Sequence, residues 1–183
     1  MKNVVISRNG PDSLHEEWLT NSDTKNWDLI LLFYDENSFK RCQIREGKSF
    51  YYPGGKWEAY YNFFRDYPDV LNNYDYFWFA DDDISLQGNE INKMFQRMND
   101  YDLDIAQPAM SLESYFSYII TIQCDFLKIR FSNFVEVMAP CLRKSLVKDM
   151  LPFFKDAFSG MGLDSVWTYK TRKEPNKIAI LDE

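Results

Sequence analysis

Two segments that are apolar on both faces constrain the fold of this chain more than any other feature. Residues 28–34 (DLILLFY) and 74–80 (YDYFWFA) have the pattern of strands buried between two layers of helices. Stretches with helical periodicity follow them, most clearly at 56–67 and 89–101, and shorter strands are predicted at 4–7 and 104–107. This alternation predicts an α/β/α sandwich of Rossmann type with a mostly parallel central sheet.

The second half of the chain is less regular. Residues 115–131 are rich in apolar and aromatic side chains but follow neither a strand nor a helix period. We expect a strand at 134–139, where the side chains alternate, and a helix over 141–154 that Pro152 breaks. A short helix near Val166 and a last strand at 177–181 complete the prediction.

Length and charge exclude several classes of protein. A chain of 183 residues predicts a single domain, and 28 acidic against 21 basic residues give a net charge of −7. Duplex nucleic-acid binding requires a basic face, so we expect no nucleic-acid partner. The 3 cysteines are far apart, and no signal peptide or transmembrane segment is visible, so we expect a soluble cytoplasmic protein.

The chain contains a single histidine, which excludes sites that need two. A Ser-His-Asp triad would have to use His15, at a predicted helix start with Ser13 as N-cap and Glu16 at the third helical position. We favour an exposed His15 without a catalytic role. The chemistry of this chain therefore rests on carboxylates.

The strongest site signal is the run Asp81-Asp82-Asp83 directly after a buried strand. Adjacent carboxylates repel one another unless a cation or several hydrogen-bond donors lie among them. Oxygen ligands of this kind suit Mg²⁺ or Mn²⁺, and ligands of open α/β sheets bind at the carboxyl ends of the strands. The alternative interpretation is a solvated acidic turn before the next helix.

A hydrophobic strand that ends in Asp-x-Asp after two β-α units resembles the nucleotide-sugar glycosyltransferases of the GT-A fold, and five short motifs occur along the chain with it. More narrowly, the chain is similar to a glycosyltransferase-like domain family that long carried only a label of unknown function. The resemblance covers nearly the whole chain. The motifs are 54–59 (GGKWEA), 74–84 (YDYFWFADDDI), 102–108 (DLDIAQP), 133–141 (NFVEVMAPC) and 160–167 (GMGLDSVW).

The resemblance implies roles for the three acids. Asp83 would ligate Mn²⁺ or Mg²⁺ directly, while Asp81 would contact the donor ribose or a metal-bound water and so share the metal site. Asp82 would face the donor sugar or a basic residue. Such a cation stabilises the charge of a departing nucleoside diphosphate.

Three further residues are expected near the nucleotide. Arg8 and Asp35 follow the first and second strands, where GT-A proteins hold the base and the ribose. Lys56 follows two glycines and opens a helix, so its ammonium group and the helix N-terminus could meet a phosphate. The alternative for Lys56 is a surface lysine in a first helical turn.

Asp164 is the predicted general base. The sequence 160–164 (GMGLD) resembles the Gly-Trp-Gly-x-Asp/Glu loop of inverting transferases, with Met161 in place of Trp. By this resemblance Asp164 removes the proton of the attacking acceptor hydroxyl. The alternative is an Asp that caps the following helix, in which case Glu136 is the next candidate.

The resemblance divides the single domain 1–183 into a nucleotide-sugar-binding half, 1–108, and an acceptor-side half, 109–183. GT-A enzymes often supply a further metal ligand after the last strand, where this chain has Asp182. The predicted function is metal-dependent, inverting sugar transfer from a nucleotide-diphosphate sugar to a hydroxyl of a glycan or another acceptor. Two alternatives remain: a non-catalytic sugar- or nucleotide-binding domain, and a phosphoryl-transfer enzyme with a second acidic cluster at Asp100, Asp102 and Asp104.

Overall fold

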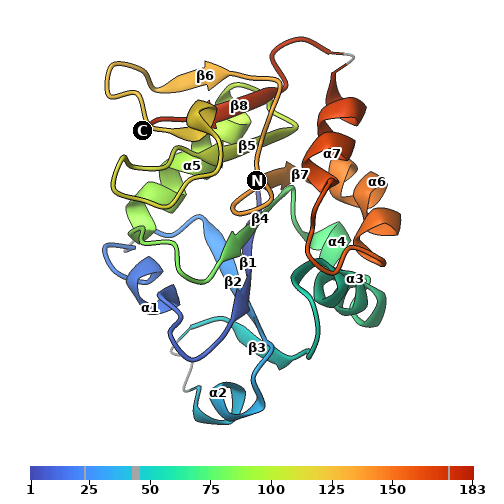
Figure 1. Ribbon diagram of the computed structural model, residues 1–183. Helices are drawn as coiled ribbons and strands as arrows, with labels where there is room; N and C mark the ends of the chain where they lie inside the picture. Colours follow the sequence, from blue (N-terminus) through green and yellow to red (C-terminus); the bar gives the residue numbers. More distant parts are fainter. Residues whose placement is uncertain (23, 43–45, 173) are drawn as a thin grey trace.

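A computed structural model describes residues 1–22, 24–42, 46–172 and 174–183, and Figure 1 shows its helices and strands. In chain order the elements are β1 (Asn3–Asn9), α1 (His15–Trp18), β2 (Trp27–Phe33), α2 (Glu36–Arg41), β3 (Lys48–Tyr51), α3 (Lys56–Asp66), α4 (Val70–Asn73), β4 (Tyr76–Asp81), α5 (Gly88–Asp100), β5 (Ile105–Pro108), the 3₁₀ turn η1 (Ile119–Thr121), β6 (Ile129–Phe131), β7 (Cys141–Arg143), α6 (Lys144–Phe154), α7 (Leu163–Thr171) and β8 (Ile178–Leu181). Within the described residues, no helix is both long enough and apolar enough to cross a membrane.

The described strands form one mixed sheet in the order β3-β2-β1-β4-β7-β5-β8-β6. The pairs β2–β3, β1–β2, β1–β4 and β5–β8 are parallel, whereas β7 runs antiparallel to both its neighbours and β6 runs antiparallel to β8. This confirms the α/β class with a mostly parallel sheet. The carboxyl ends of β1, β2, β4, β5 and β8 therefore meet at one edge.

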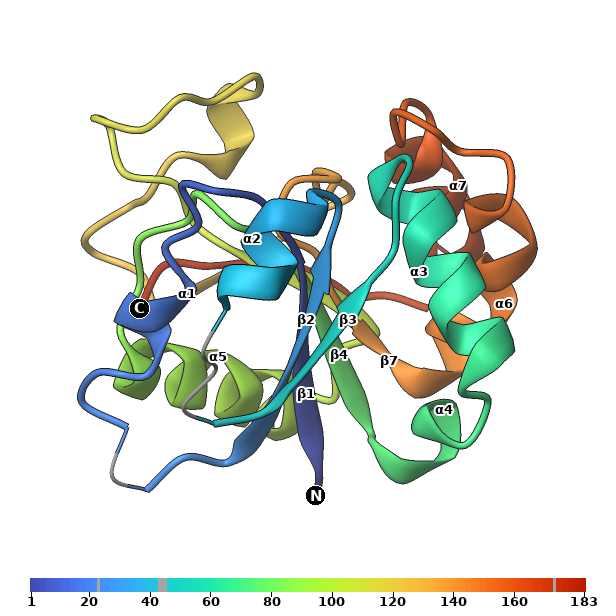
Figure 2. The same cartoon turned by 90° about the horizontal axis from the view of Figure 1, so that it is seen from below.

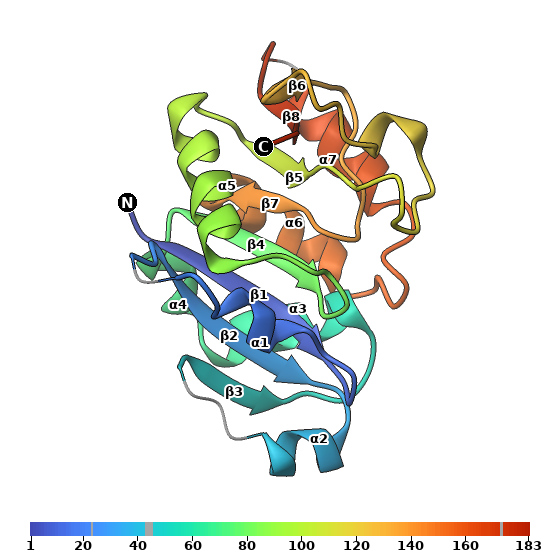
Figure 3. The same cartoon turned by 90° about the vertical axis from the view of Figure 1, so that its left-hand side faces the viewer.

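Two apolar cores cover the two faces of the sheet, and both use β4. Phe77 and Phe79 point into the core that also contains Trp57 of α3 and Trp167 of α7. Trp78 points into the opposite core, under α1 and α5. Figures 2 and 3 show α3, α4, α6 and α7 on one side of the sheet and α1 and α5 on the other. The apolar character of both faces of β4 follows from this burial.

The two predicted halves of the chain interlock in the sheet. β7 comes from the second half, yet it lies between β4 and β5 of the first half and pairs with both. β8, also from the second half, pairs with β5 along its whole length. Residues 108 and 109 therefore do not separate two structural units.

The predicted strand at 134–139 is wrong. The segment is irregular and turns at Val137 and Met138, although the Met138 carbonyl still accepts a hydrogen bond from the backbone N–H of Asp81 at 3.1 Å. The alternation of side chains is misleading because the carbonyls of Val137 and Met138 turn toward Lys56, at the start of α3. The predicted helix 141–154 instead consists of strand β7 followed by α6, which continues through Pro152 for its last turn.

Candidate functional site

Asp81, Asp82 and Asp83 point in different directions at the end of β4. Asp82 turns toward the loop after β1, where its Oδ2 accepts a hydrogen bond from the backbone N–H of Gly10 at 2.7 Å. Burial raises the pKa of the Asp82 carboxyl above its ordinary value, and the hydrogen bond from Gly10 partly opposes this shift. Asp82 therefore holds the β1 loop in place through a backbone amide, and its contact with the donor sugar stays a prediction.

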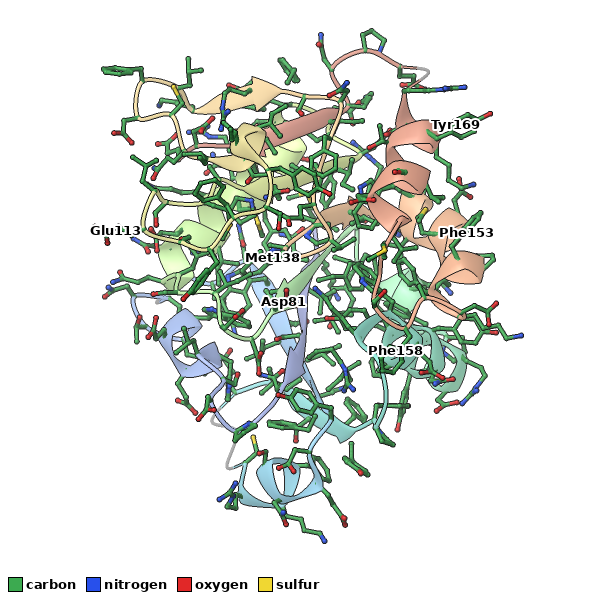
Figure 4. All side chains as sticks on the ribbon, viewed as in Figure 1. Asp81, Glu113, Met138, Phe153, Phe158 and Tyr169 are labelled. Carbon is green, nitrogen blue, oxygen red and sulfur yellow. The ribbon has the colours of Figure 1, made fainter. Side chains whose placement is uncertain are left out.

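Lys56, at the start of α3, connects three parts of the carboxyl edge. Its Nζ donates to Asp81 Oδ1 at 2.7 Å and to the carbonyls of Val137 and Met138, each at 2.9 Å. An ammonium group has three N–H donors, so this geometry engages them all. Figure 4 shows Asp81 and Met138 next to each other at the end of β4. Lys56 therefore has a structural role that the sequence did not indicate, and a phosphate would have to replace one of these acceptors.

Two glycines bring the loop of Lys56 against the loop of Asp164. A Cβ atom on Gly55 would lie 2.5 Å from the carbonyl oxygen of Phe158, and one on Gly160 would lie 2.4 Å from the indole nitrogen of Trp57. Real Cβ atoms do not approach other atoms so closely, so larger residues would push the loops apart. In Figure 4, Phe158 lies beside the start of α3. The two motifs, far apart in the sequence, thus form one wall of the site.

We expect Gly160→Ala to destabilise the protein more than Gly162→Ala. Both glycines have left-handed backbone, with φ of +76° and +89°, which costs an alanine about 1–2 kcal/mol. A Cβ on Gly162 would meet nothing within 4 Å, whereas one on Gly160 would strike the fully buried Trp57. Thermal unfolding should show a fall in Tm of about 2–8 °C for Gly162→Ala and at least about twice that for Gly160→Ala. Equal losses would contradict the proposed contact.

Asp164 lies in the first turn of α7, and the helix does not depend on it for capping. The N-cap is Gly162, while Asp164 Oδ1 accepts a hydrogen bond from the backbone N–H of Ser165 at 2.8 Å. The interpretation of Asp164 as N-cap is therefore wrong. Trp167, one turn further along, donates from Nε1 to the carbonyl of Val135 at 2.9 Å and so fixes α7 against the irregular segment.

Glu136 links Asp164 with the Lys56–Asp81 pair. Its side chain is nearly buried, with 5% of the residue exposed, and this burial is the largest cause that raises the pKa of its carboxyl. A hydrogen bond with the side chain of Ser117 lowers this pKa, the negative charges of Asp164 and Asp81 raise it, and the positive charge of Lys56 lowers it. The hydrogen bonds of Lys56 to Asp81 and to the carbonyl of Val137 place this ion pair beside Glu136, and the bond of Trp167 to Val135 brings α7, the helix of Asp164, to the same segment.

Asp83 is exposed and lies in a pocket at the carboxyl edge that Asp81 does not line. It lines a pocket of about 520 Å³ together with residues that follow β5 and β8, among them Glu113 and Asp182. Met138 also lines this pocket, and its carbonyl binds Lys56, so the pocket adjoins the Lys56–Asp81 pair. That Asp81 and Asp83 bind the same ligand stays a prediction, since Asp81 faces Lys56 and Asp83 faces the pocket.

The residues around Asp83 do not form a metal centre by themselves. Among the described residues, no group of three or more His, Cys, Asp or Glu side chains is arranged to hold a metal ion. Both oxygens of the Asp182 carboxylate already accept hydrogen bonds. The donors are the Arg130 guanidinium, at 2.8 and 2.9 Å, and the backbone N–H of Cys124, at 2.8 Å. A metal ion would have to compete with these donors for Asp182, and its role as a further ligand stays a prediction.

Arg8 and Asp35 lie at the expected strand ends but have structural partners. The guanidinium of Arg8 is buried and donates to the carbonyls of Leu32 at 3.0 Å and Gly54 at 2.6 Å. Asp35 is the N-cap of α2 and accepts from the backbone N–H of Ser38 at 2.6 Å. Contacts of Arg8 and Asp35 with a nucleotide stay predictions.

His15 is not the exposed residue that we expected. Its side chain is 12% exposed, its Nδ1 is 2.8 Å from the Ser13 hydroxyl, and its ring lies edge-on to Phe33. The helix start also differs, because α1 begins at His15 with Leu14 as an N-cap that makes no side-chain hydrogen bond. His15 lines a second pocket, of about 650 Å³, between the loop after β1 and α2.

The second acidic cluster required by a phosphoryl-transfer enzyme is absent at the place considered. Asp102 forms ion pairs with Arg143 and Lys177, and Asp104 pairs with Arg143 at 2.9 Å. Asp102 and Asp104 precede β5, at the edge of the sheet opposite to Asp81. This geometry does not favour the phosphoryl-transfer alternative.

The sheet order and the acidic carboxyl edge define a single α/β domain with a GT-A-like fold. The chain belongs to the family described as "Protein of unknown function (DUF707)", whose model matches residues 16–183. Among proteins with curated descriptions, none matches the chain.

Solved structures share the fold at low sequence identity. S. aureus TarS 1-349 in complex with UDP-GlcNAc matches with a TM-score of 0.64 and 14% identity, covering 100% of this chain and 56% of TarS 1-349. The same protein in complex with UDP gives a TM-score of 0.63, again at 14% identity, with coverages of 100% and 58%. A197 from STIV gives 0.55 at 14% identity, with coverages of 100% and 82%. The chain thus spans a little over half the length of TarS 1-349.

Proposed function

We propose that this chain transfers a sugar from a nucleoside-diphosphate sugar to a hydroxyl group of an acceptor, with inversion at the anomeric carbon. The observation that carries the proposal is the position of Asp81 and Glu136 at the carboxyl edge of the sheet, with α7, the helix of Asp164, held by Trp167 against the residue before Glu136. In open α/β folds this edge binds the ligand. The fold shared with TarS, which was solved with UDP-GlcNAc and with UDP, supports a nucleotide sugar as the donor.

In this proposal the donor lies along the carboxyl edge. The nucleoside would lie near the loops that follow β1 and β2, beside Asp35 and the pocket of about 650 Å³. The sugar would lie over the turn at Val137 and Met138, between Asp81 and Asp164. The pocket beside Asp83 would then receive the diphosphate or the acceptor.

Asp164 acts as the general base in this proposal. Its carboxylate accepts the proton of the acceptor hydroxyl while that oxygen forms a bond to the anomeric carbon. The bond between this carbon and the diphosphate oxygen breaks on the opposite face, and the electron pair leaves with the nucleoside diphosphate. Attack from the face opposite to the leaving group inverts the configuration.

We propose that Mn²⁺ or Mg²⁺ binds with the donor rather than before it. Asp83 is exposed and can supply one carboxylate, so the diphosphate and water would supply most of the other ligands. Such a cation neutralises charge on the diphosphate.

The experiment that tests this function is calorimetric titration of the chain with UDP and with GDP, each in Mn²⁺ and in EDTA. We expect one nucleotide to bind, and to bind about 5–150-fold more tightly with the cation, because each ligand raises the affinity for the other. Equal affinity in Mn²⁺ and EDTA would contradict the metal dependence. No binding of either nucleotide under any condition would contradict the function itself. Binding without turnover of any donor would favour the non-catalytic alternative.

A further inference from the structure

Two hydrogen bonds with buried side chains hold the backbone at Glu136. Its N–H donates to Oε1 of Gln107 at 2.6 Å, and Gln107, at the carboxyl end of β5, is completely buried. One residue before, the carbonyl of Val135 accepts from Trp167. The acidic side chain is therefore fixed at the carboxyl edge, although most carboxylates of this chain lie at the surface.

The carboxylate of Glu136 is under-satisfied in the free protein. Its Oε2 has almost no accessible surface and has no hydrogen-bond partner within the described part of the chain. A buried polar atom without a partner costs on the order of 1–3 kcal/mol, and natural proteins keep few of them. The hydroxyl of Ser117 lies near enough to this carboxylate to lower its pKa by hydrogen bonding. A hydroxyl is thus the group that this carboxylate binds already.

Ser117 belongs to a surface segment that can be displaced at low cost. Its neighbours Tyr115 and Ile119 are 97% and 80% exposed, and Ser117 itself is exposed. A contact between the rings of Tyr118 and Phe134, 4.4 Å between centroids, holds the segment near Glu136. Few buried contacts oppose its movement, so another hydroxyl can take the place of Ser117.

The charges around Glu136 restrict which sugar can bind. The carboxylates of Asp81 and Asp164 act on that of Glu136, and so does the ammonium group of Lys56, whose N–H groups are already engaged. A sugar that carried a carboxylate would add a fourth negative charge at short range. A neutral sugar would instead donate its hydroxyls to these oxygens.

We propose that Glu136 binds a hydroxyl of the transferred sugar in the place of Ser117, and that it selects neutral sugars over sugar acids. This inference rests on the proposed function, because it takes the donor to be a nucleotide sugar. Glu136 is then the residue through which the chain distinguishes a nucleotide sugar from the bare nucleotide.

The test compares Glu136→Gln with the wild type in calorimetric titrations with UDP, UDP-glucose, UDP-GlcNAc and UDP-glucuronate, or with GDP, GDP-mannose and GDP-mannuronate if the chain binds guanosine. We expect the wild type to bind the neutral donor about tenfold or more tightly than the acidic one. Glu136→Gln should lose part of this difference, since Asp81 and Asp164 keep their charges, and should keep its affinity for the bare nucleotide within about twofold. Asp149→Asn, which removes one exposed charge on α6, is the matched control and should change neither value.

Thermal unfolding separates this role from a structural one. The amide is isosteric and removes a buried charge, so Glu136→Gln should melt at or above the wild-type Tm. A lower Tm together with equal losses for nucleotide and nucleotide sugar would overturn the inference, as would unchanged discrimination between neutral and acidic donors. If the wild type bound no nucleotide, the proposed function would fail and the inference with it.

Discussion

Asp164→Asn should lower the rate of sugar transfer by about 10²–10⁴-fold, the usual contribution of a positioned general base. An amide cannot accept the proton of the acceptor hydroxyl. It keeps an oxygen for the hydrogen bond from Ser165, and Gly162 rather than Asp164 caps the helix, so the fold should persist. The rate is measured as release of nucleoside diphosphate from the donor, and donor affinity is measured separately by calorimetry.

The control for this variant is Asp156→Asn, which removes an exposed carboxylate from the loop that leads to α7. We expect this control to keep the wild-type rate. A loss of donor affinity that matched the loss of rate would show that Asp164 binds the donor instead of acting as base. Activity close to wild type in Asp164→Asn would exclude it as base and would make Glu136 the next residue to test.

Asp83→Ala should abolish the effect of the divalent cation on nucleotide binding. The gain of about 5–150-fold expected in Mn²⁺ should disappear, while the affinity in EDTA should remain that of the wild type. Asp83 is exposed and follows two other acids, so removing its charge relieves repulsion and should not lower the Tm. Calorimetry in Mn²⁺ and in EDTA measures both affinities.

Glu113→Ala is the matched control for Asp83, because Glu113 is an exposed acid on the same pocket. In Figure 4, Glu113 lies at the periphery of the molecule, away from Asp81. We expect the cation effect to survive in this variant. If both variants lost it equally, the pocket would attract cations by its overall charge, and Asp83 would not be a specific ligand.

The elements that could be predicted from the sequence are those whose burial leaves a local pattern. β2 and β4 are apolar on both faces because helices cover both sides, and α3 and α5 carry regular apolar stripes. β3 and α2 were not predicted. β3 is a short strand at the edge of the sheet, and without continuous burial it leaves no apolar run in the sequence. The segment 134–139 imitates a strand, but its conformation is decided by Lys56, far away in the sequence.

The residues of the site also divide into those that a local sequence pattern predicts and those that depend on distant partners. The position of Asp81 to Asp83 at the carboxyl edge followed from the strand before them, as did the expectation that Asp35 lies at the end of β2. The contact of Gly55 with Phe158 and that of Gly160 with Trp57 have no local signature, because each depends on a partner about a hundred residues away. The contact of α7, the helix of Asp164, with the segment of Glu136 also has no local signature in the sequence. An acid in an otherwise apolar segment was the available signal, and from the sequence Glu136 was only the next candidate for the base after Asp164.

The insertion of β7 between β4 and β5 has a consequence for how the chain folds during synthesis. Phe77 pairs with Leu142, which also pairs with Ile105, so the centre of the sheet closes only after these distant residues have been made. Non-local pairing of this kind slows folding. Until β7 arrives, β4 and β5 each expose an unpaired edge that another chain can bind. A nascent chain stopped at residue 108 would therefore be prone to aggregate.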